Sequence, residues 1–260
     1  MKGKSYLVTG ASRGVGLCLV QQLAQKEGKP LVFAAARSPE KYAELQDLEK
    51  EHKQVHVVRL DLTDVETIKA AAGEVNQILM TKGHDGLDFL IQDAGTSEDL
   101  VPPLDTPDDM LKLVFTTNAV GPIWVYKYFR PLVQRSQLKT MVFFASNFGS
   151  LTLASEPLRN PEKSTPLDAT QIAYKASKAA VNMETIIIAR DARDEGFTVI
   201  SMHPGVADTD MGSRPQEVVE EMKPEVSPEE TARLQIQLYD KLTTEDNGKF
   251  LDYKGNKLPW

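Results

Sequence analysis

A tyrosine and a lysine stand four residues apart at Tyr174 and Lys178, in an alanine-rich run that favours a helix. Residues at this spacing lie on the same face of a helix, so we expect the two side chains to be neighbours. An ammonium beside a phenol stabilises the phenolate and so lowers the pKa of the tyrosine. A phenol tuned in this way can give or take a proton near neutral pH, as general acid–base catalysis requires.

The tyrosine–lysine spacing is weak evidence when it stands alone. A second pair, Tyr253 and Lys257, has the same spacing across a Lys-Gly-Asn turn, where the two side chains need not share a face. We interpret that second pair as a chance match. The first pair therefore gains meaning only from the elements that would position it.

A glycine-rich stretch near the N-terminus, residues 9–16, reads Thr-Gly-Ala-Ser-Arg-Gly-Val-Gly. It follows the apolar run Ser5–Val8 and precedes a run with helical spacing that begins at Leu17. A strand, a glycine loop and a helix N-terminus together form a binding site for a nucleotide pyrophosphate. The alternative, an ordinary glycine turn, is less consistent with the strand and helix on either side.

Two arginines favour a phosphorylated form of the nucleotide. Folds that bind NAD place an acid about 20 residues after the glycines, where it holds the ribose 2′-hydroxyl. Here that place is taken by Ala36 and Arg37, and Arg13 lies in the glycine loop. Two guanidiniums suit a 2′-phosphate, which favours NADP(H) over NAD(H). The alternative is that both arginines are solvated surface residues.

Apolar runs alternate with helical segments along the whole chain, without an internal repeat or a clear domain boundary. Continuous apolar strands indicate a parallel sheet that helices cover on both faces. We therefore predict an α/β fold, a Rossmann-type doubly wound parallel sheet of about seven strands, in a single domain over residues 1–260. The predicted strands are Ser5–Val8, Leu31–Ala36, Val55–Leu60, Leu87–Ile91, Thr140–Ala145, Phe197–Met202 and Gly248–Leu251.

Ligands of such sheets bind at the carboxyl ends of the strands. The residues expected along that rim are Gly10, Arg37, Asp61, Gln92, Ser146 and Pro204. Polar, proline-rich stretches over residues 151–170 and 206–226 predict two irregular loops, the first of which lies directly before the Tyr174 helix. Asn118, Gly121 and Pro122 predict an interruption in the long helical region that ends near Arg135.

The bulk composition excludes several classes of protein. The net charge is −7, which argues against a nucleic-acid binder. Cys18 is the single cysteine, so neither a disulfide framework nor a cysteine zinc site is expected, and no metal site is predicted. The apolar stretches are shorter than the ~20 residues that span a bilayer, and the N-terminus lacks the pattern of a secretory signal. We expect a soluble, cytoplasmic protein that binds neither membrane nor nucleic acid.

These motifs, taken in order, resemble the short-chain dehydrogenase/reductase family over the whole chain. Residues 9–16 look like its coenzyme loop, Asp61-Leu62 like its adenine contact, and Ser146 and Tyr174–Lys178 like its catalytic serine, tyrosine and lysine. The resemblance implies four catalytic residues, Asn118, Ser146, Tyr174 and Lys178. It implies contacts to NADPH or NADP+ from Gly10, Ser12, Arg13, Gly14, Val15, Gly16, Arg37, Asp61, Leu62, Asp93, Ala94, Gly95, Asn118, Tyr174, Lys178, Pro204, Gly205, Val206 and Thr209.

Within the family, residues 119–122 and 203–212 and the ending Leu258-Pro259-Trp260 look most like the sniffer/C-factor-like carbonyl reductases. This resemblance implies hydride transfer from NADPH to a ketone, aldehyde or quinone, with Tyr174 as the proton donor. It implies that residues 151–170 are an insertion loop and that residues 206–226 form a loop that covers the substrate. It also implies a homodimer packed through the Tyr174 helix, which the insertion of residues 151–170 would oppose.

Two departures from the family pattern are visible. The family's Asn-Asn-Ala-Gly is Gln92-Asp93-Ala94-Gly95 here, and the gap from Ser146 to Tyr174 is about twice the usual length. We expect altered local bonding and not loss of coenzyme binding. Two alternatives remain at this stage: a non-catalytic protein that binds or senses NADPH on the same fold, and a nucleotide-sugar epimerase.

Overall fold

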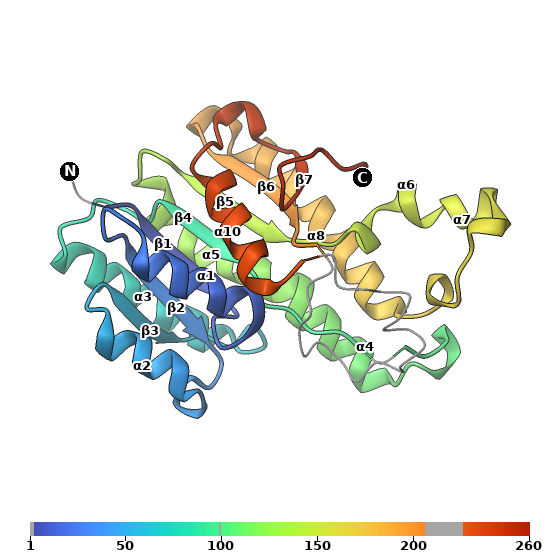
Figure 1. The fold of residues 1–260 in the computed structure, drawn as a ribbon, viewed down its shortest axis with the longest axis horizontal. Coiled ribbons are helices and arrows are strands. Elements are labelled where there is room, and N and C mark those ends of the chain that lie inside the picture. The colour runs from blue at the N-terminus through green and yellow to red at the C-terminus, as the bar shows by residue number, and fades with distance from the viewer. Residues whose placement is uncertain (1–2, 99, 206–225) are drawn as a thin grey trace.

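The computed structural model describes residues 3–98, 100–205 and 226–260. Its described strands form one parallel sheet of seven strands in the order β3-β2-β1-β4-β5-β6-β7, which confirms the predicted fold class (Figure 1). Each strand lies within two residues of its predicted run. The strands are β1 (Ser5–Thr9), β2 (Leu31–Ala36), β3 (Val55–Arg59), β4 (Phe89–Gln92), β5 (Thr140–Phe144), β6 (Thr198–His203) and β7 (Phe250–Asp252).

Helices cover both faces of this sheet. The described α-helices are α1 (Gly14–Gln25), α2 (Ala43–Glu51), α3 (Val65–Thr81), α4 (Asp108–Phe115), α5 (Gly121–Gln134), α6 (Leu151–Ala154), α7 (Glu156–Arg159), α8 (Ile172–Asp191) and α10 (Pro228–Tyr239). Apolar side chains of α3, α5 and α8 pack on one face, and those of α1, α2 and α10 pack on the other. None of the described helices combines the length and the apolar character that crossing a membrane requires.

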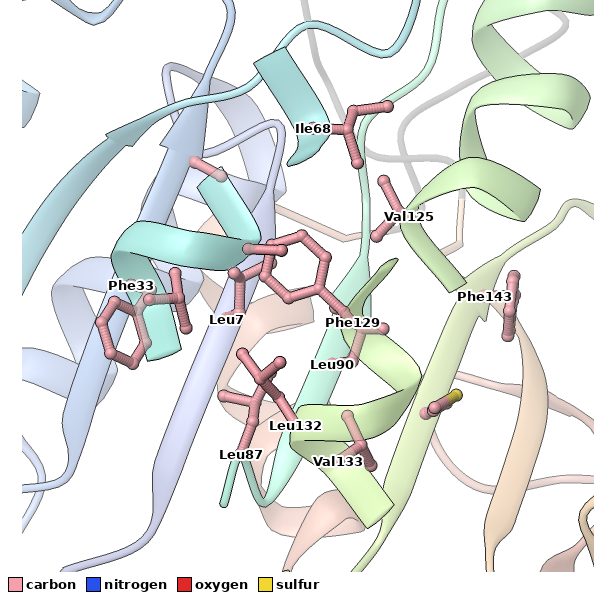
Figure 2. Packing of buried hydrophobic residues seen from close by; sticks show 14 of the residues in the cluster. Leu7, Phe33, Ile68, Leu87, Leu90, Val125, Phe129, Leu132, Val133 and Phe143 are labelled. Carbon is pink, nitrogen blue, oxygen red and sulfur yellow. The ribbon is translucent and has the colours of Figure 1, made fainter. Parts of the chain in front are cut away.

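The core explains why the strands are apolar without alternation. Leu7 of β1 joins the cluster on one face, while its neighbours Tyr6 and Val8 join the cluster on the other. Figure 2 shows the first cluster, in which Leu7 and Leu90 lie near Phe129 of α5. Because successive side chains of a strand point to opposite faces, both sets must be apolar when both faces are covered.

Residues 151–170 differ from the predicted irregular loop. They form α6, α7 and two short 3-10 turns, Pro161–Lys163 and Pro166–Ala169, in a segment that extends away from the sheet in Figure 1. Local caps account for these turns: Ser150 Oγ accepts a hydrogen bond from the Leu153 N–H, and Thr165 forms a capping box with Asp168. The polar composition that suggested a loop therefore supplies helix caps.

The long helical region is interrupted around Asn118, as predicted. The interruption is a π-helical turn over Thr116–Val120, and α4, this turn and α5 follow one another directly. A π-helical turn inserts one residue into a helix and is often found at functional sites. Here it carries Asn118, which is 1% exposed.

Candidate active site

A cleft of about 310 Å³ runs along the carboxyl ends of the strands, at the point between β1 and β4 where the strand order reverses. Five of the six predicted rim residues line it: Gly10, Arg37, Asp61, Ser146 and Pro204. The sixth, Gln92, ends β4 as predicted but does not line the cleft. Its side chain is buried in the sheet, where its amide atoms have no hydrogen-bond partner among the described residues.

The glycine loop brings the start of α1 close to the end of β4. A Cβ on Gly16 would lie 2.5 Å from the Gly10 carbonyl oxygen and 2.7 Å from Asp93 Oδ2, so only glycine fits there. The N-cap residue Arg13 makes no capping hydrogen bond and the first turn of α1 holds no acid, but Asp93 accepts a hydrogen bond from the Gly16 N–H. The N–H groups before Gly16 and the positive end of the helix dipole suit an anion.

One end of the cleft holds the two arginines. Arg13 and Arg37 are exposed and line it, and neither guanidinium bonds another residue in the part of the chain that the structure describes. Ser12, Gly14, Val15 and Leu62 line this end as well, as does Tyr42, which the sequence did not single out. Asp61 accepts hydrogen bonds from the N–H and the hydroxyl of Thr63, at 2.9 and 2.8 Å.

Asn118 lies behind the cleft and does not line it. Its Oδ1 accepts from the Thr96 N–H at 2.8 Å, and its Nδ2 donates to the Thr96 carbonyl at 2.8 Å and to Ser177 Oγ at 3.0 Å. The amide therefore fixes the loop after Gly95 and ties it to α8. Direct contact between Asn118 and the coenzyme stays a prediction.

Ser146 follows β5 and is held in place by a close contact with α8. Its hydroxyl lines the cleft and accepts a hydrogen bond from the Phe148 N–H at 3.2 Å. Three residues later, a Cβ on Gly149 would lie 2.5 Å from the backbone carbon of Lys178. The missing side chain lets the turn that carries Ser146 pack directly against the helix that carries Tyr174.

Tyr174 and Lys178 both face the cleft from α8, as their spacing predicts. The Lys178 ammonium lies 5.6 Å from the centre of the Tyr174 ring and donates to the Phe144 carbonyl at 2.6 Å. Its two other N–H groups have no partner among the described residues. Burial lowers the pKa of Lys178 to about 8, although nearby Asp93 and Glu184 oppose that shift.

The second tyrosine–lysine pair, Tyr253 and Lys257, lies outside the cleft. Tyr253 is 4% exposed, and its ring packs against Gly205, while Lys257 lies on a hairpin opposite Leu251. The two residues share no helix, so the spacing that brings Tyr174 and Lys178 onto one helix face has no such effect here.

The departure at Asp93 places a carboxylate beside the coenzyme loop. Burial raises the pKa of Asp93 to about 7, while Lys178 and the Gly16 N–H pull it down. An unfolded aspartate has a pKa near 3.8. The native state therefore holds more protons than the unfolded chain between these values, and stability falls as the pH rises from about 4 to about 7.

We expect Asp93→Asn to remove this pH dependence. The amide keeps an acceptor for the Gly16 N–H but carries no charge, so the variant should be more stable than the wild type by more than about 1 kcal/mol at pH 8. The advantage should grow from about pH 4 to pH 7 and then level off. Urea unfolding at several pH values measures it, and an equal or lower stability of the variant at pH 8 would contradict the burial argument.

Three residues in or beside the cleft were not predicted. Glu98 bonds the first turn of α8, and Tyr42 and His203 line the cleft. Burial lowers the pKa of His203 to about 4, so its imidazole is neutral at physiological pH. No local motif marks these residues, because each acts through a partner or a cleft formed by distant parts of the chain.

The remaining predicted contacts divide into two groups. Ala94, Gly95, Pro204 and Gly205 line the cleft as expected. Val206, Thr209 and nearly all of the predicted covering loop, 206–226, lie outside the described residues.

Comparison with known proteins gives a consistent set of relatives. The model of the short chain dehydrogenase family matches residues 4–158 and 165–219. An uncharacterized oxidoreductase of Schizosaccharomyces pombe is 36% identical over 266 residues, which cover 99% of this chain and 98% of the relative. The C-signal protein of Myxococcus xanthus is 30% identical over 176 residues, or 67% of this chain and 93% of that protein.

Two solved structures share the whole fold. The NADPH-bound carbonyl reductase from chicken fatty liver superposes with a TM-score of 0.85 at 28% identity, covering 100% of this chain and 95% of that one. The carbonyl reductase Sniffer of Drosophila melanogaster gives a TM-score of 0.84 at 25% identity, with 99% and 100% covered.

Proposed function

The chain belongs to the short-chain dehydrogenase family of oxidoreductases, and from this premise we propose that it is an NADPH-dependent reductase of ketone, aldehyde or quinone carbonyls. The observation that carries the proposal is the meeting of Ser146, Tyr174 and Lys178 in one cleft that Arg13 and Arg37 also line. The NADPH-bound carbonyl reductase that shares the fold supports it.

The residues present fit a dinucleotide. The start of α1, whose N-cap residue makes no capping hydrogen bond, and the absence of a side chain at Gly16 form a cradle that suits a pyrophosphate. Arg13 and Arg37 would hold a 2′-phosphate, because guanidiniums make strong, often bidentate bonds to phosphate and no carboxylate pairs with them among the described residues. At the other end Lys178, with two N–H groups still to donate, would hold the ribose next to the nicotinamide.

The bound coenzyme would supply the hydride, and the protein's own groups would manage the charge that forms on the carbonyl oxygen. Ser146 Oγ would donate a hydrogen bond to that oxygen and orient it. Tyr174 would hold a proton on its phenol oxygen and transfer it to the same oxygen as negative charge builds there. Lys178 would favour the phenolate that this transfer leaves behind.

Substrate choice would rest on the segments beside the catalytic residues. Phe148 and Gln171 line the cleft near Tyr174, and residues 151–170 connect these two positions. We propose that this segment forms one wall of the substrate pocket. A cytoplasmic location, a homodimer and coverage of the substrate by residues 206–226 stay predictions.

Removal of both arginine side chains is expected to change coenzyme preference. In the double variant Arg13→Ala/Arg37→Ala, the Kd for NADPH should rise about 10²- to 10⁴-fold, because two contacts are lost and each hydrogen bond to a charged group is worth roughly 1.5–3 kcal/mol. The Kd for NADH, which has no 2′-phosphate, should change by less than about threefold. Titration of protein fluorescence with each coenzyme measures both values. An equal loss for the two coenzymes would show that the arginines do not read the phosphate.

The activity itself is tested with a panel of ketones, aldehydes and quinones, each assayed with NADPH and with NADH. We expect carbonyl-dependent oxidation of NADPH for at least one compound class, and weaker activity with NADH. Saturable NADPH binding without turnover across the panel would contradict the proposal and favour a protein that binds or senses the coenzyme.

A further inference from the structure

The catalytic helix begins in an unusual way. Its N-cap residue, Gln171, has left-handed backbone angles, φ 57° and ψ 47°, and its side chain makes no capping hydrogen bond. The first turn of α8 contains no acidic residue. A helix normally needs acceptors for the N–H groups of its first turn, and Tyr174 is part of that turn.

The missing acceptors come from a distant loop. The Glu98 carboxylate accepts hydrogen bonds from the Ala173 N–H at 2.7 Å and from the Tyr174 N–H at 3.0 and 3.2 Å. Glu98 is 3% exposed, and glutamates are almost never buried to this extent without partners. A carboxylate at a helix N-terminus also interacts favourably with the helix dipole.

The loop that carries Glu98 is itself fixed on two sides. The Asn118 amide bonds both backbone groups of Thr96, and Gln171 Nε2 donates to Ser97 Oγ at 2.8 Å. Ser177 Oγ completes the connection, because it accepts from Asn118 Nδ2 and donates to the Tyr174 carbonyl at 2.7 Å. Residues 96–98 are therefore held between the π-helical turn and the first two turns of α8.

We propose that Glu98 is a positioning residue for Tyr174, whose buried carboxylate replaces the absent N-cap and fixes the first turn of the catalytic helix. The inference rests on the proposed function, in which Tyr174 is the proton donor. A proton donor must lie within hydrogen-bond reach of the reacting oxygen, and a displacement of ~1 Å can lower the rate about 100-fold.

The test compares Glu98→Ala with Glu98→Gln, which keeps one acceptor oxygen. The matched control is Asp64→Ala, because Asp64 caps α3 by accepting from the Glu66 N–H at 3.0 Å and lies outside the cleft. Hydrogen exchange over residues 172–178, kcat at saturating NADPH and carbonyl, and the Kd for NADPH are measured for each protein.

In Glu98→Ala we expect exchange in this segment to rise about tenfold and kcat to fall roughly 10- to 100-fold, with the Kd for NADPH changed by less than about twofold. In Glu98→Gln, both the exchange rate of this segment and kcat should return most of the way to the wild-type values. Asp64→Ala should lower the Tm and leave the exchange of residues 172–178 and kcat unchanged.

Unchanged exchange or unchanged kcat in Glu98→Ala would overturn the inference, and so would an equal fall of kcat in Asp64→Ala. If the wild type turns over no carbonyl, the proposed function fails separately. In that case, faster hydrogen exchange at the start of α8 in Glu98→Ala would still support the capping role of Glu98. Unchanged exchange in that variant would overturn this role.

Discussion

Replacement of Tyr174 by phenylalanine is expected to lower kcat for carbonyl reduction by about 10²- to 10⁴-fold, the range that a positioned general acid contributes. The substitution removes one hydroxyl group and keeps the ring that faces Lys178, so the helix and the cleft should persist. The Kd for NADPH should therefore change by less than about threefold. Steady-state kinetics with the best carbonyl of the panel, combined with coenzyme titration, measures both quantities.

The matched control for this variant is Tyr253→Phe, which makes the same change in the second Tyr-x-x-x-Lys pair. Tyr253 is buried against Gly205 and does not line the cleft, so kcat should stay close to that of the wild type. Near-normal turnover in Tyr174→Phe would remove Tyr174 from its role as proton donor.

Lys178→Met is expected to have the second largest effect. It removes a buried ammonium that lies 5.6 Å from the Tyr174 ring, and with it the stabilisation of the phenolate. We expect kcat to fall about 10²- to 10³-fold, as when one preorganised donor is lost from a charged transition state. NADPH should also bind more weakly, because the proposed contact with the ribose is lost.

The pKa of Lys178 adds a pH test to this prediction. Burial lowers the value to about 8 in the coenzyme-free protein, so the ammonium is lost as the pH rises through that value. The affinity of the wild type for NADPH should therefore weaken above about pH 8, and this step should be missing in Lys178→Met. In the control Lys175→Met the step should remain, because the Lys175 ammonium bonds the Leu167 carbonyl and not the cleft. If the affinity of Lys178→Met for NADPH weakened over the same pH range, the titrating group would be one other than Lys178.

Much of the fold could be predicted because its strongest signals are local. The strands are buried on both faces and so appear in the sequence as continuous apolar runs, with ends predicted to within two residues. The order of the strands in the sheet was not predicted, because it depends on pairings between segments far apart in the chain. The character of residues 151–170 was missed, since four-residue helices carry too little periodicity to distinguish them from a loop.

In the candidate site as well, the features that could be predicted are those that a short stretch of sequence determines. Tyr174 and Lys178 share one helix face, and the glycine loop follows its strand directly, so each could be recognised from a short stretch of sequence. Glu98 could not, because it meets the start of α8 from 75 residues away and no motif surrounds it. The unusual properties of Asp93 were also hidden, since its raised pKa follows from burial between the glycine loop and Lys178.

The central claim is that this protein moves a hydride from NADPH to a carbonyl carbon while Tyr174 supplies the proton. The most direct measurement is a single-turnover reaction with NADPH deuterated at the transferring position, in which mass spectrometry follows the label. We predict one deuterium on the carbinol carbon of the product with the wild type, and no labelled product in the same time with Tyr174→Phe. NADPH binding without labelled alcohol from any ketone or aldehyde of the panel, or equal labelling by the two proteins, would contradict the claim.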